Sequence, residues 1–268
     1  MKKLTYNLTI LVLCLSACAG NPSQKEKSAS TTSIADSTEV EPETATIEKG
    51  HAAFKNSFDK ENIFDWTIDY AYYKCETCEL MPYQKAINEM VSEFFDANMK
   101  TAKLDLSFFE RVFKNMDKDQ REMNADTEYP MPFGLDGTVA ITESDDRAQL
   151  YLQQYVFLGG AHGSTTVSYF QVDKASGKKL GLKDFISSKS KLDRLSEKYF
   201  RKQNEIPMVG TLMDQGFDAE FSCNENFFFQ NDSLFFFYNQ YEIACYAMGS
   251  FEFGIPLKDL RGLLTRKP

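Results

Sequence analysis

Residue types that could support chemistry are concentrated in two short segments of the second half of the chain. The first, Gly159 to Gly163 (GGAHG), contains His162, one of only two histidines in the sequence, the other being His51. Glycine lets the backbone bend or approach another group closely, and an imidazole titrates near neutral pH. His162 could therefore meet a ligand. The alternative is a tight connection in which the imidazole bonds to backbone groups.

The second segment runs from Tyr241 to Gly249 (YEIACYAMG) and combines aromatic rings with one carboxylate. Tyr241, Glu242 and Tyr246 could line a binding surface, because tyrosine is enriched where proteins contact their partners. The competing interpretation is a buried connection whose tyrosine hydroxyls satisfy backbone groups. Together with His162, these three residues form the candidate ligand-binding set.

A catalytic assignment has less support. Two histidines exclude a site that needs several imidazoles, such as the two-histidine zinc helix of metalloproteases. The chain has no Gly-x-Ser-x-Gly nucleophile elbow, no phosphate-binding loop and no dinucleotide-binding fingerprint. One catalytic alternative remains, an envelope hydrolase or deacetylase that uses His162 with a carboxylate such as Glu242. We assign no catalytic residue, no metal and no cofactor from the sequence.

Four cysteines lie C-terminal to Cys18, namely Cys75, Cys78, Cys223 and Cys245. The N-terminus, described below, has the features of an export signal; in an exported protein an even set of cysteines forms disulfides by default, and three pairings are open. A zinc site is a weaker alternative because only the first pair is closely spaced. A redox role for Cys75 and Cys78 is another, but the next helix is predicted to begin only at Pro82 and no βαβ pattern surrounds the motif. All four residues are disulfide candidates, and structural disulfides are the favoured interpretation.

Hydrophobic spacing predicts the elements that position these segments. Rough alternation predicts a strand over 62–73, and apolar spacings of three and four predict a helix from Pro82 to about Thr101. Asp105 can cap a second helix, and the charged run 118–128 is predicted to loop outward. Further strands are predicted over 137–142, 149–158, 163–173, 227–229, 235–238 and 251–255, with a helix after 185 and a short one from Pro256.

These elements come in groups, which is typical of the α+β class. We expect a mainly antiparallel sheet with helices packed on it. Residues 51–126 are predicted to form a small N-terminal α/β module of one strand and two helices, and residues 127–268 a larger β-rich domain. Asn231 to Ser233 lies between two phenylalanine-rich runs and predicts a hairpin turn.

The N-terminus has the features of an export signal. Lys2 and Lys3 precede an apolar run from Leu8 to Leu15, which is too short to span a bilayer. The run ends in Leu-Ser-Ala-Cys18, which resembles the lipobox of bacterial lipoproteins, where the chain is cut before the cysteine and acyl chains are attached to it. We therefore expect a signal peptide over 1–17, lipidation at Cys18 and a disordered tether over 18–50. A plain signal peptide with an incidental cysteine is the alternative.

Location and charge restrict the partners. Several acyl chains make a durable membrane anchor, and Ala19 after the cysteine favours the outer membrane by resemblance to envelope-sorting rules. We expect the protein in the cell envelope, on the outer membrane or the periplasmic face. The net charge of −9 argues against nucleic acid and anionic lipid as partners and is compatible with a cationic protein.

Several short motifs occur in an order that resembles one known family. Gly159 to Gly163 is followed by residues 173–185 (DKASGKKLGLKDF), and Tyr241 to Gly249 is followed by residues 253–256 (FGIP). This order resembles an exported domain family of unknown function. That family forms the outer part of a lysozyme-sensing anti-sigma factor (RsiV-like) and occurs beside the catalytic domain of a peptidoglycan deacetylase (PdaC-like). Residues from Trp66 through the helix around Asn88 resemble the smaller module that usually precedes it, so the resemblance covers about 52–266.

The resemblance implies binding and not catalysis. In the sensor the domain binds lysozyme. In the deacetylase the chemistry belongs to a separate catalytic domain, and we expect no such domain in this sequence. The sensor's sigma-binding segment and membrane helix have no counterpart, so signalling is not implied. Cys245 stands where the family often has proline, and it could form with Cys223 a bridge particular to this protein. We expect a non-catalytic envelope lipoprotein that binds a lysozyme-like protein or peptidoglycan.

Overall fold

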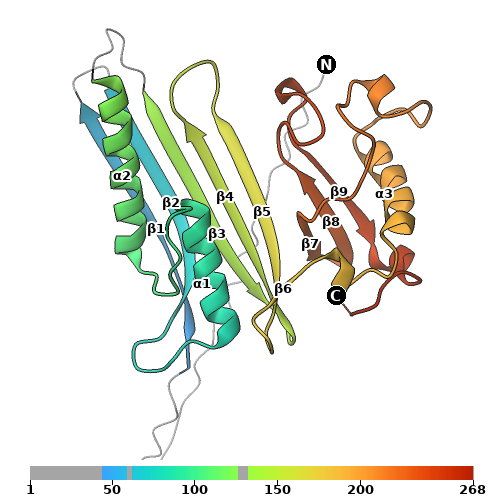
Figure 1. Cartoon of the computed structure of the whole chain (residues 1–268), viewed down its shortest axis with the longest axis horizontal. Coiled ribbons are helices and arrows are strands. Elements are labelled where there is room, and N and C mark those ends of the chain that lie inside the picture. Colours follow the sequence, from blue (N-terminus) through green and yellow to red (C-terminus); the bar gives the residue numbers. More distant parts are fainter. Residues whose placement is uncertain (1–43, 59–61, 126–131, 268) are drawn as a thin grey trace, which may run out of the picture. The chain divides into compact units, whose positions relative to one another are not determined.

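The computed structural model describes residues 44–58, 62–125 and 132–267, which form two sheets and the helices packed on them (Figure 1). The six-stranded sheet has the order β1-β2-β3-β4-β5-β6, and the three-stranded sheet has the order β7-β8-β9. The predicted α+β class with a mainly antiparallel sheet is confirmed. The signal peptide, Cys18, most of the expected tether and the expected boundary at 126/127 lie outside the described residues.

The six-stranded sheet contains one parallel pair. Its strands are β1 (Thr46–Phe58), β2 (Asn62–Lys74), β3 (Phe133–Glu143), β4 (Arg147–Phe157), β5 (Ser164–Asp173) and β6 (Lys179–Leu180). Only β2 and β3 pair in parallel. A parallel pair needs a long crossover connection, and α1 (Pro82–Phe95) and α2 (Leu106–Asn124) supply it on one face of the sheet (Figure 1). Strands from both sides of the expected 126/127 boundary therefore share one sheet.

The two crossover helices differ from the sequence prediction at their C-terminal ends. Helix α1 begins at Pro82 as predicted but ends at Phe95, because Asp96 is extended with φ −146°. In α2 the carboxylate of Asp105 accepts a hydrogen bond from the Phe108 amide at 3.0 Å, which confirms the predicted cap.

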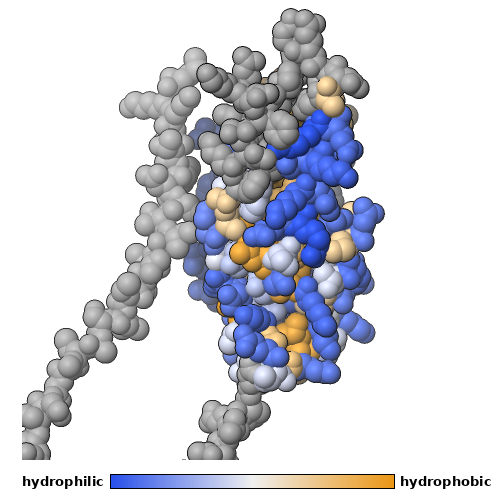
Figure 2. All heavy atoms as spheres, turned by 90° about the vertical axis from the view of Figure 1, so that its left-hand side faces the viewer, coloured by the Kyte–Doolittle hydropathy of each residue, from blue (hydrophilic) through white to orange (hydrophobic). Residues whose placement is uncertain are grey.

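The prediction of a loop over 118–128 is wrong for its first seven residues, which belong to α2 as far as Asn124. Ion pairs between residues one turn apart, Asp117 with Arg121 and Lys118 with Glu122, stabilise this charged run as a helix. On the side of the molecule that carries α2, Figure 2 shows mainly hydrophilic residues with small, separated hydrophobic areas. The charged run is thus the last part of α2, in which Lys118, Asp119 and Glu122 are exposed and Arg121 is half-buried.

The first hydrophobic core lies between the six-stranded sheet and these helices. Ile68, Leu150 and Leu152 of the strands pack with Ile87 and Phe109 of the helices, and all five are buried.

The first strand was not expected, because 18–50 was assigned to the tether. Strand β1 nevertheless begins at Thr46 and pairs with β2 along its whole length.

The second core lies between α3 (Lys189–Gln203) and the three-stranded sheet of β7 (Phe227–Gln230), β8 (Ser233–Tyr238) and β9 (Phe251–Pro256). Phe200 of α3 packs against Phe253 of β9 with ring centroids 5.6 Å apart. The predicted hairpin turn is confirmed, with Asn231 and Asp232 at φ 48° and 55°. Short 3-10 helices occupy Leu182–Asp184, Met213–Gln215, Tyr246–Met248 and Leu257–Leu260.

Contacts between β4, β5 and β7 join the two sheets. Tyr169 of β5 stacks on Phe228 of β7 with ring centroids 4.1 Å apart. The side-chain oxygen of Gln149 accepts hydrogen bonds from the Phe229 amide and from the buried Gln171. None of the helices in the described part of the chain is both long enough and apolar enough to cross a bilayer.

Candidate functional site

The structure brings His162 and Tyr246 into direct contact, although they lie 84 positions apart in the numbering. Their rings stack with centroids 3.7 Å apart and planes 17° from parallel. The Tyr246 hydroxyl donates a hydrogen bond of 2.9 Å to the Gly163 carbonyl, and Nδ1 of His162 lies 3.2 Å from the same oxygen. One carbonyl group thus fixes both rings.

Tyr241 extends this contact into a surface. Its ring centroid lies 5.6 Å from that of Tyr246, and the residue is 63% exposed. We call the surface formed by His162, Tyr241 and Tyr246 the aromatic platform. Exposed apolar residues, Leu158 and Met248, flank it in the sequence. An exposed group of aromatic rings with adjacent apolar residues has the composition of a protein-binding surface.

The backbone under Tyr241 is strained. Tyr241 has φ 65°, in the left-handed region that bulky residues rarely adopt. Such a conformation costs about 1–3 kcal/mol and persists only where surrounding structure imposes it. Because the exposed ring of Tyr241 gains little from burial, its packing does not offset that cost. Strain of this kind is characteristic of functional positions.

The glycines of the β4–β5 connection are required by geometry. Gly159 and Gly160 have φ 83° and 97°, a region open to glycine at little cost. At Gly163 the constraint is space, because a Cβ there would overlap the ring of Tyr155. A side chain at residue 163 would therefore displace the ring of Tyr155, which packs against the backbone whose carbonyl anchors both platform rings.

Two asparagines attach the site to β5. Asn239 accepts a hydrogen bond of 2.7 Å from the Val167 amide and donates one of 3.0 Å to the Val167 carbonyl. Asn226 donates to the same carbonyl at 2.9 Å and accepts from the Tyr169 amide at 2.8 Å. These side chains satisfy the backbone groups on the side of β5 that faces away from β4. The sequence prediction missed both, because asparagine is common in turns and nothing distinguishes these two.

Glu242 belongs to the support of the platform. One of its oxygens accepts from the Asn224 side chain at 2.8 Å and the other from the Asn239 amide at 2.7 Å. In the described part of the chain no hydrogen bond joins Glu242 to His162. Of the four candidate ligand-binding residues, the structure therefore brings His162, Tyr241 and Tyr246 together, whereas Glu242 fixes the turn that carries Tyr241.

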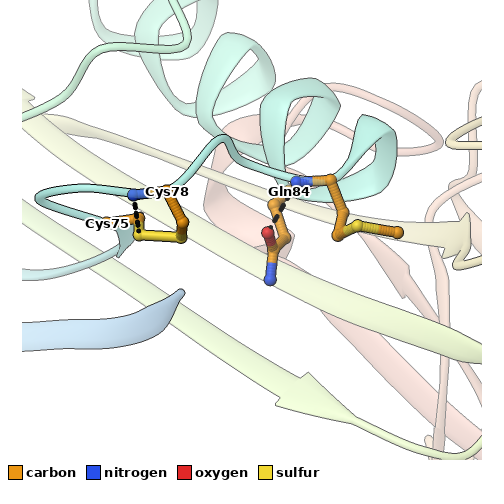
Figure 3. Close-up of a disulfide and its surroundings, with 4 residues drawn as sticks. Cys75, Cys78 and Gln84 are labelled. Carbon is orange, nitrogen blue, oxygen red and sulfur yellow. Dashed lines mark hydrogen bonds between the residues drawn. A yellow bond between two sulfur atoms is a disulfide. The ribbon is translucent and has the colours of Figure 1, made fainter. Parts of the chain in front are cut away.

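The first cysteine pair forms a disulfide at the entry to α1. Cys75 and Cys78 are bonded, with Cα atoms 5.5 Å apart, and the Cys78 amide donates a hydrogen bond of 3.0 Å to the Cys75 sulfur (Figure 3). Figure 3 also shows Gln84, whose side-chain oxygen accepts from the Met81 amide at 2.8 Å and so caps the helix. The disulfide closes a short turn at the start of the connection between β2 and α1.

Cys223 and Cys245, one of the pairings left open by the sequence, do not form a bridge, and both are free thiols. Cys223 is 3% exposed in the second core, and its amide donates to Asp193 of α3 at 2.9 Å. Burial raises the pKa of the Cys223 thiol to about 12. Cys245, in contrast, is exposed just before Tyr246. Across residues 44–58, 62–125 and 132–267, no group of three or more His, Cys, Asp or Glu side chains could hold a metal ion.

Comparison with known proteins identifies one family model. Residues 183–258 match the model described as a protein of unknown function (DUF3298). The DUF3298 match contains α3, all three strands of the three-stranded sheet (β7, β8 and β9) and the Tyr241 to Gly249 segment. No curated protein matches the chain.

Two solved structures of DUF3298 proteins are similar in fold over most of this chain. One, a member of the DUF3298 family from Bacteroides fragilis NCTC 9343, has a TM-score of 0.70 and 17% identity and covers 84% of this chain and 95% of its own. Another, a DUF3298 family protein from Pseudomonas aeruginosa PAO1, has a TM-score of 0.55 and 18% identity and covers 84% of this chain and 96% of its own. The TM-scores establish a shared fold, and because the sequence identities are low, the function has to be argued from the site.

Proposed function

We propose that this chain is a non-catalytic binding module of the cell envelope, tethered by a lipid on Cys18, and that its aromatic platform binds a lysozyme-like protein. The observation that carries the proposal is the platform itself. Two connections distant in sequence meet to present His162, Tyr246 and the strained, exposed Tyr241.

The contacts beneath the platform support binding by a preformed surface. The Gly163 carbonyl fixes two of the rings, and Asn239 and Glu242 fix the turn that carries Tyr241. Rings held in place lose little conformational entropy when a partner packs on them, which favours affinity. Tyrosine is also among the residues that most often dominate the binding energy of an interface.

Charge and resemblance favour a cationic protein as the ligand. The chain has a net charge of −9, and opposite charge accelerates and orients the approach of a partner. The sequence resembles the RsiV-like domain that binds lysozyme and the PdaC-like domain beside a deacetylase. Peptidoglycan is the second candidate, because an exposed tyrosine ring such as Tyr241 also offers a flat face to a sugar.

The hydrolase or deacetylase alternative has less geometric support. A general base must lie within hydrogen-bond reach of its partners, and both Glu242 oxygens already accept hydrogen bonds from asparagine groups. Cys75 and Cys78 are the one bonded pair in the described residues that could support the redox alternative, because Cys223 is buried with a raised pKa and forms no bridge with the exposed Cys245.

The test uses the chain from residue 18 onward with Cys18→Ser, so that no acyl chain contributes. Calorimetry with hen lysozyme should show binding, and Tyr241→Ala should weaken it at least about 10-fold, as truncation of a central tyrosine does. Met123→Ala is the matched control, because Met123 is 65% exposed on α2, away from the platform. It should bind as the parent does.

Three results would decide against parts of this proposal. Binding of peptidoglycan fragments in place of lysozyme, with the same loss in Tyr241→Ala, would assign the platform to a glycan. Binding of neither ligand at high micromolar concentration would refute both assignments. Unchanged lysozyme binding in Tyr241→Ala would remove the platform from the interface.

A further inference from the structure

Helix α3 carries a stripe of unpaired positive charge in an acidic protein. Lys191, Arg194, Lys198 and Lys202 follow one another at spacings of three, four and four residues, which places them on one face of the helix, and all four are exposed. We call these four residues the basic stripe. In the part of the chain that the structure describes, none of them forms an ion pair or a hydrogen bond.

The acidic residues of α3 do not neutralise the stripe. Asp193 pairs with Lys189 at 3.0 Å, and Glu197 pairs with the buried Arg201 at 2.8 Å. Each carboxylate thus already has a cation outside the stripe. The four charges of the stripe have no such partner and face solvent together.

A rigid apolar loop lies beside the stripe. Arg194, Lys198 and Met208 line a groove of about 500 Å³, together with Glu197 and Arg201, which pair with each other. Arg201 donates hydrogen bonds to the carbonyls of Pro207 and Gly210, at 2.6 and 3.2 Å, and so holds the loop in place. Val209, between these anchors, is 73% exposed. The buried Arg201 therefore holds the loop so that the apolar side chain of Val209 is exposed to solvent.

From this combination we propose that the basic stripe and the Met208–Val209 loop form a docking surface for an anionic phospholipid bilayer. Basic residues close to an anionic bilayer are attracted to its headgroups, and apolar side chains beside them gain by entering the acyl boundary. The platform and its proposed ligand take no part in this contact.

The net negative charge of the chain does not prevent such docking. At physiological ionic strength, exposed charges more than about 8 Å apart are largely screened from one another. A bilayer at α3 therefore interacts chiefly with the stripe, and hardly with acidic residues on distant surfaces. The sequence-based argument against anionic lipid used only the total charge, which carries no information on this local arrangement.

The test measures co-sedimentation of the chain from residue 18 onward, with Cys18→Ser, with vesicles of phosphatidylcholine containing 30% phosphatidylglycerol. It should bind these vesicles, bind pure phosphatidylcholine vesicles much less, and dissociate in 0.5 M NaCl. Lys198→Gln with Lys202→Gln should lower the partition coefficient roughly 25-fold, since each charge removed lowers it about fivefold. Val209→Ser should also weaken binding, with the fold unchanged by circular dichroism.

The matched control is Lys103→Gln with Lys178→Gln, which removes the same charge from two exposed lysines outside α3. It should leave vesicle binding within about twofold of the parent. An equal loss in this control, or no preference of the parent for phosphatidylglycerol, would overturn the proposal. Capture by soluble dextran sulfate without any vesicle binding would assign the stripe to an anionic glycan and overturn it too. Lysozyme binding should not change in any stripe variant.

Discussion

Replacing Asn239 with alanine would cut the attachment of the platform to β5. The side chain of Asn239 accepts from the Val167 amide and donates to the Val167 carbonyl, and Val167 is 5% exposed. The carbonyl keeps a second donor in Asn226, but the amide has only Asn239. The substitution therefore leaves one buried N–H without a partner.

A buried polar group left without a partner costs about 1–3 kcal/mol, so we expect the free energy of unfolding to fall by about 2 kcal/mol. For a domain of this size that corresponds to a fall in Tm of about 4–8 °C. Because Glu242 accepts from the Asn239 backbone amide, the turn that carries Tyr241 is expected to loosen from β5 without losing its own internal bond. In Asn239→Ala the affinity for lysozyme should therefore fall together with the free energy of unfolding.

Urea unfolding followed by tryptophan fluorescence measures this difference, since Trp66 is the single tryptophan. Asn115→Ala on the exposed face of α2 is the control, and it should stay within about 0.5 kcal/mol of the parent. If Asn239→Ala also stays within that range, the Val167 amide does not depend on Asn239, and the described attachment of the site is incorrect.

Two further predictions concern thiols and acid. Iodoacetamide should label Cys245 in the native chain within minutes and Cys223 only after unfolding, because burial raises the pKa of the Cys223 thiol to about 12. Peptide mass spectrometry measures the labelling of each cysteine. Equal labelling of both in the native chain would contradict the buried position of Cys223. Hydrogen bonds from Ser176 and Arg266 lower the pKa of Asp173 to about 2, so its contribution to stability is present above about pH 4 and is lost as the pH falls toward 2. The destabilisation caused by Ser176→Ala should accordingly be present at pH 6 and become progressively smaller as the pH falls toward 2. An NMR titration that gives Asp173 its ordinary pKa would contradict this.

Local patterns predicted most of the elements correctly. The start of α1 at Pro82, the cap at Asp105 and the hairpin turn at Asn231 and Asp232 depend on neighbouring residues only, and the sequence shows those directly. The two segments of the candidate site were also recognisable, because glycine and tyrosine clusters of that kind are uncommon. What the sequence predicted least well were features created by distant partners.

Strand β1 illustrates this difference. Its N-terminal part is polar and has few large apolar residues, so its strand conformation follows from pairing with β2 and not from its own pattern. The parallel pairing of β2 with β3 likewise depends on how the crossover helices pack. At the site, the role of Glu242 could not be foreseen, because it is set by Asn224 and by the Asn239 amide.

The asparagine contacts on β5 also bear on association between molecules. An edge strand with free amide and carbonyl groups is a template on which a strand of another molecule can add, which leads to aggregation. On β5, Asn226 and Asn239 already occupy the groups of Val167 and Tyr169 that an incoming strand would use. The same two side chains that hold the platform therefore also block the addition of a strand along this part of β5.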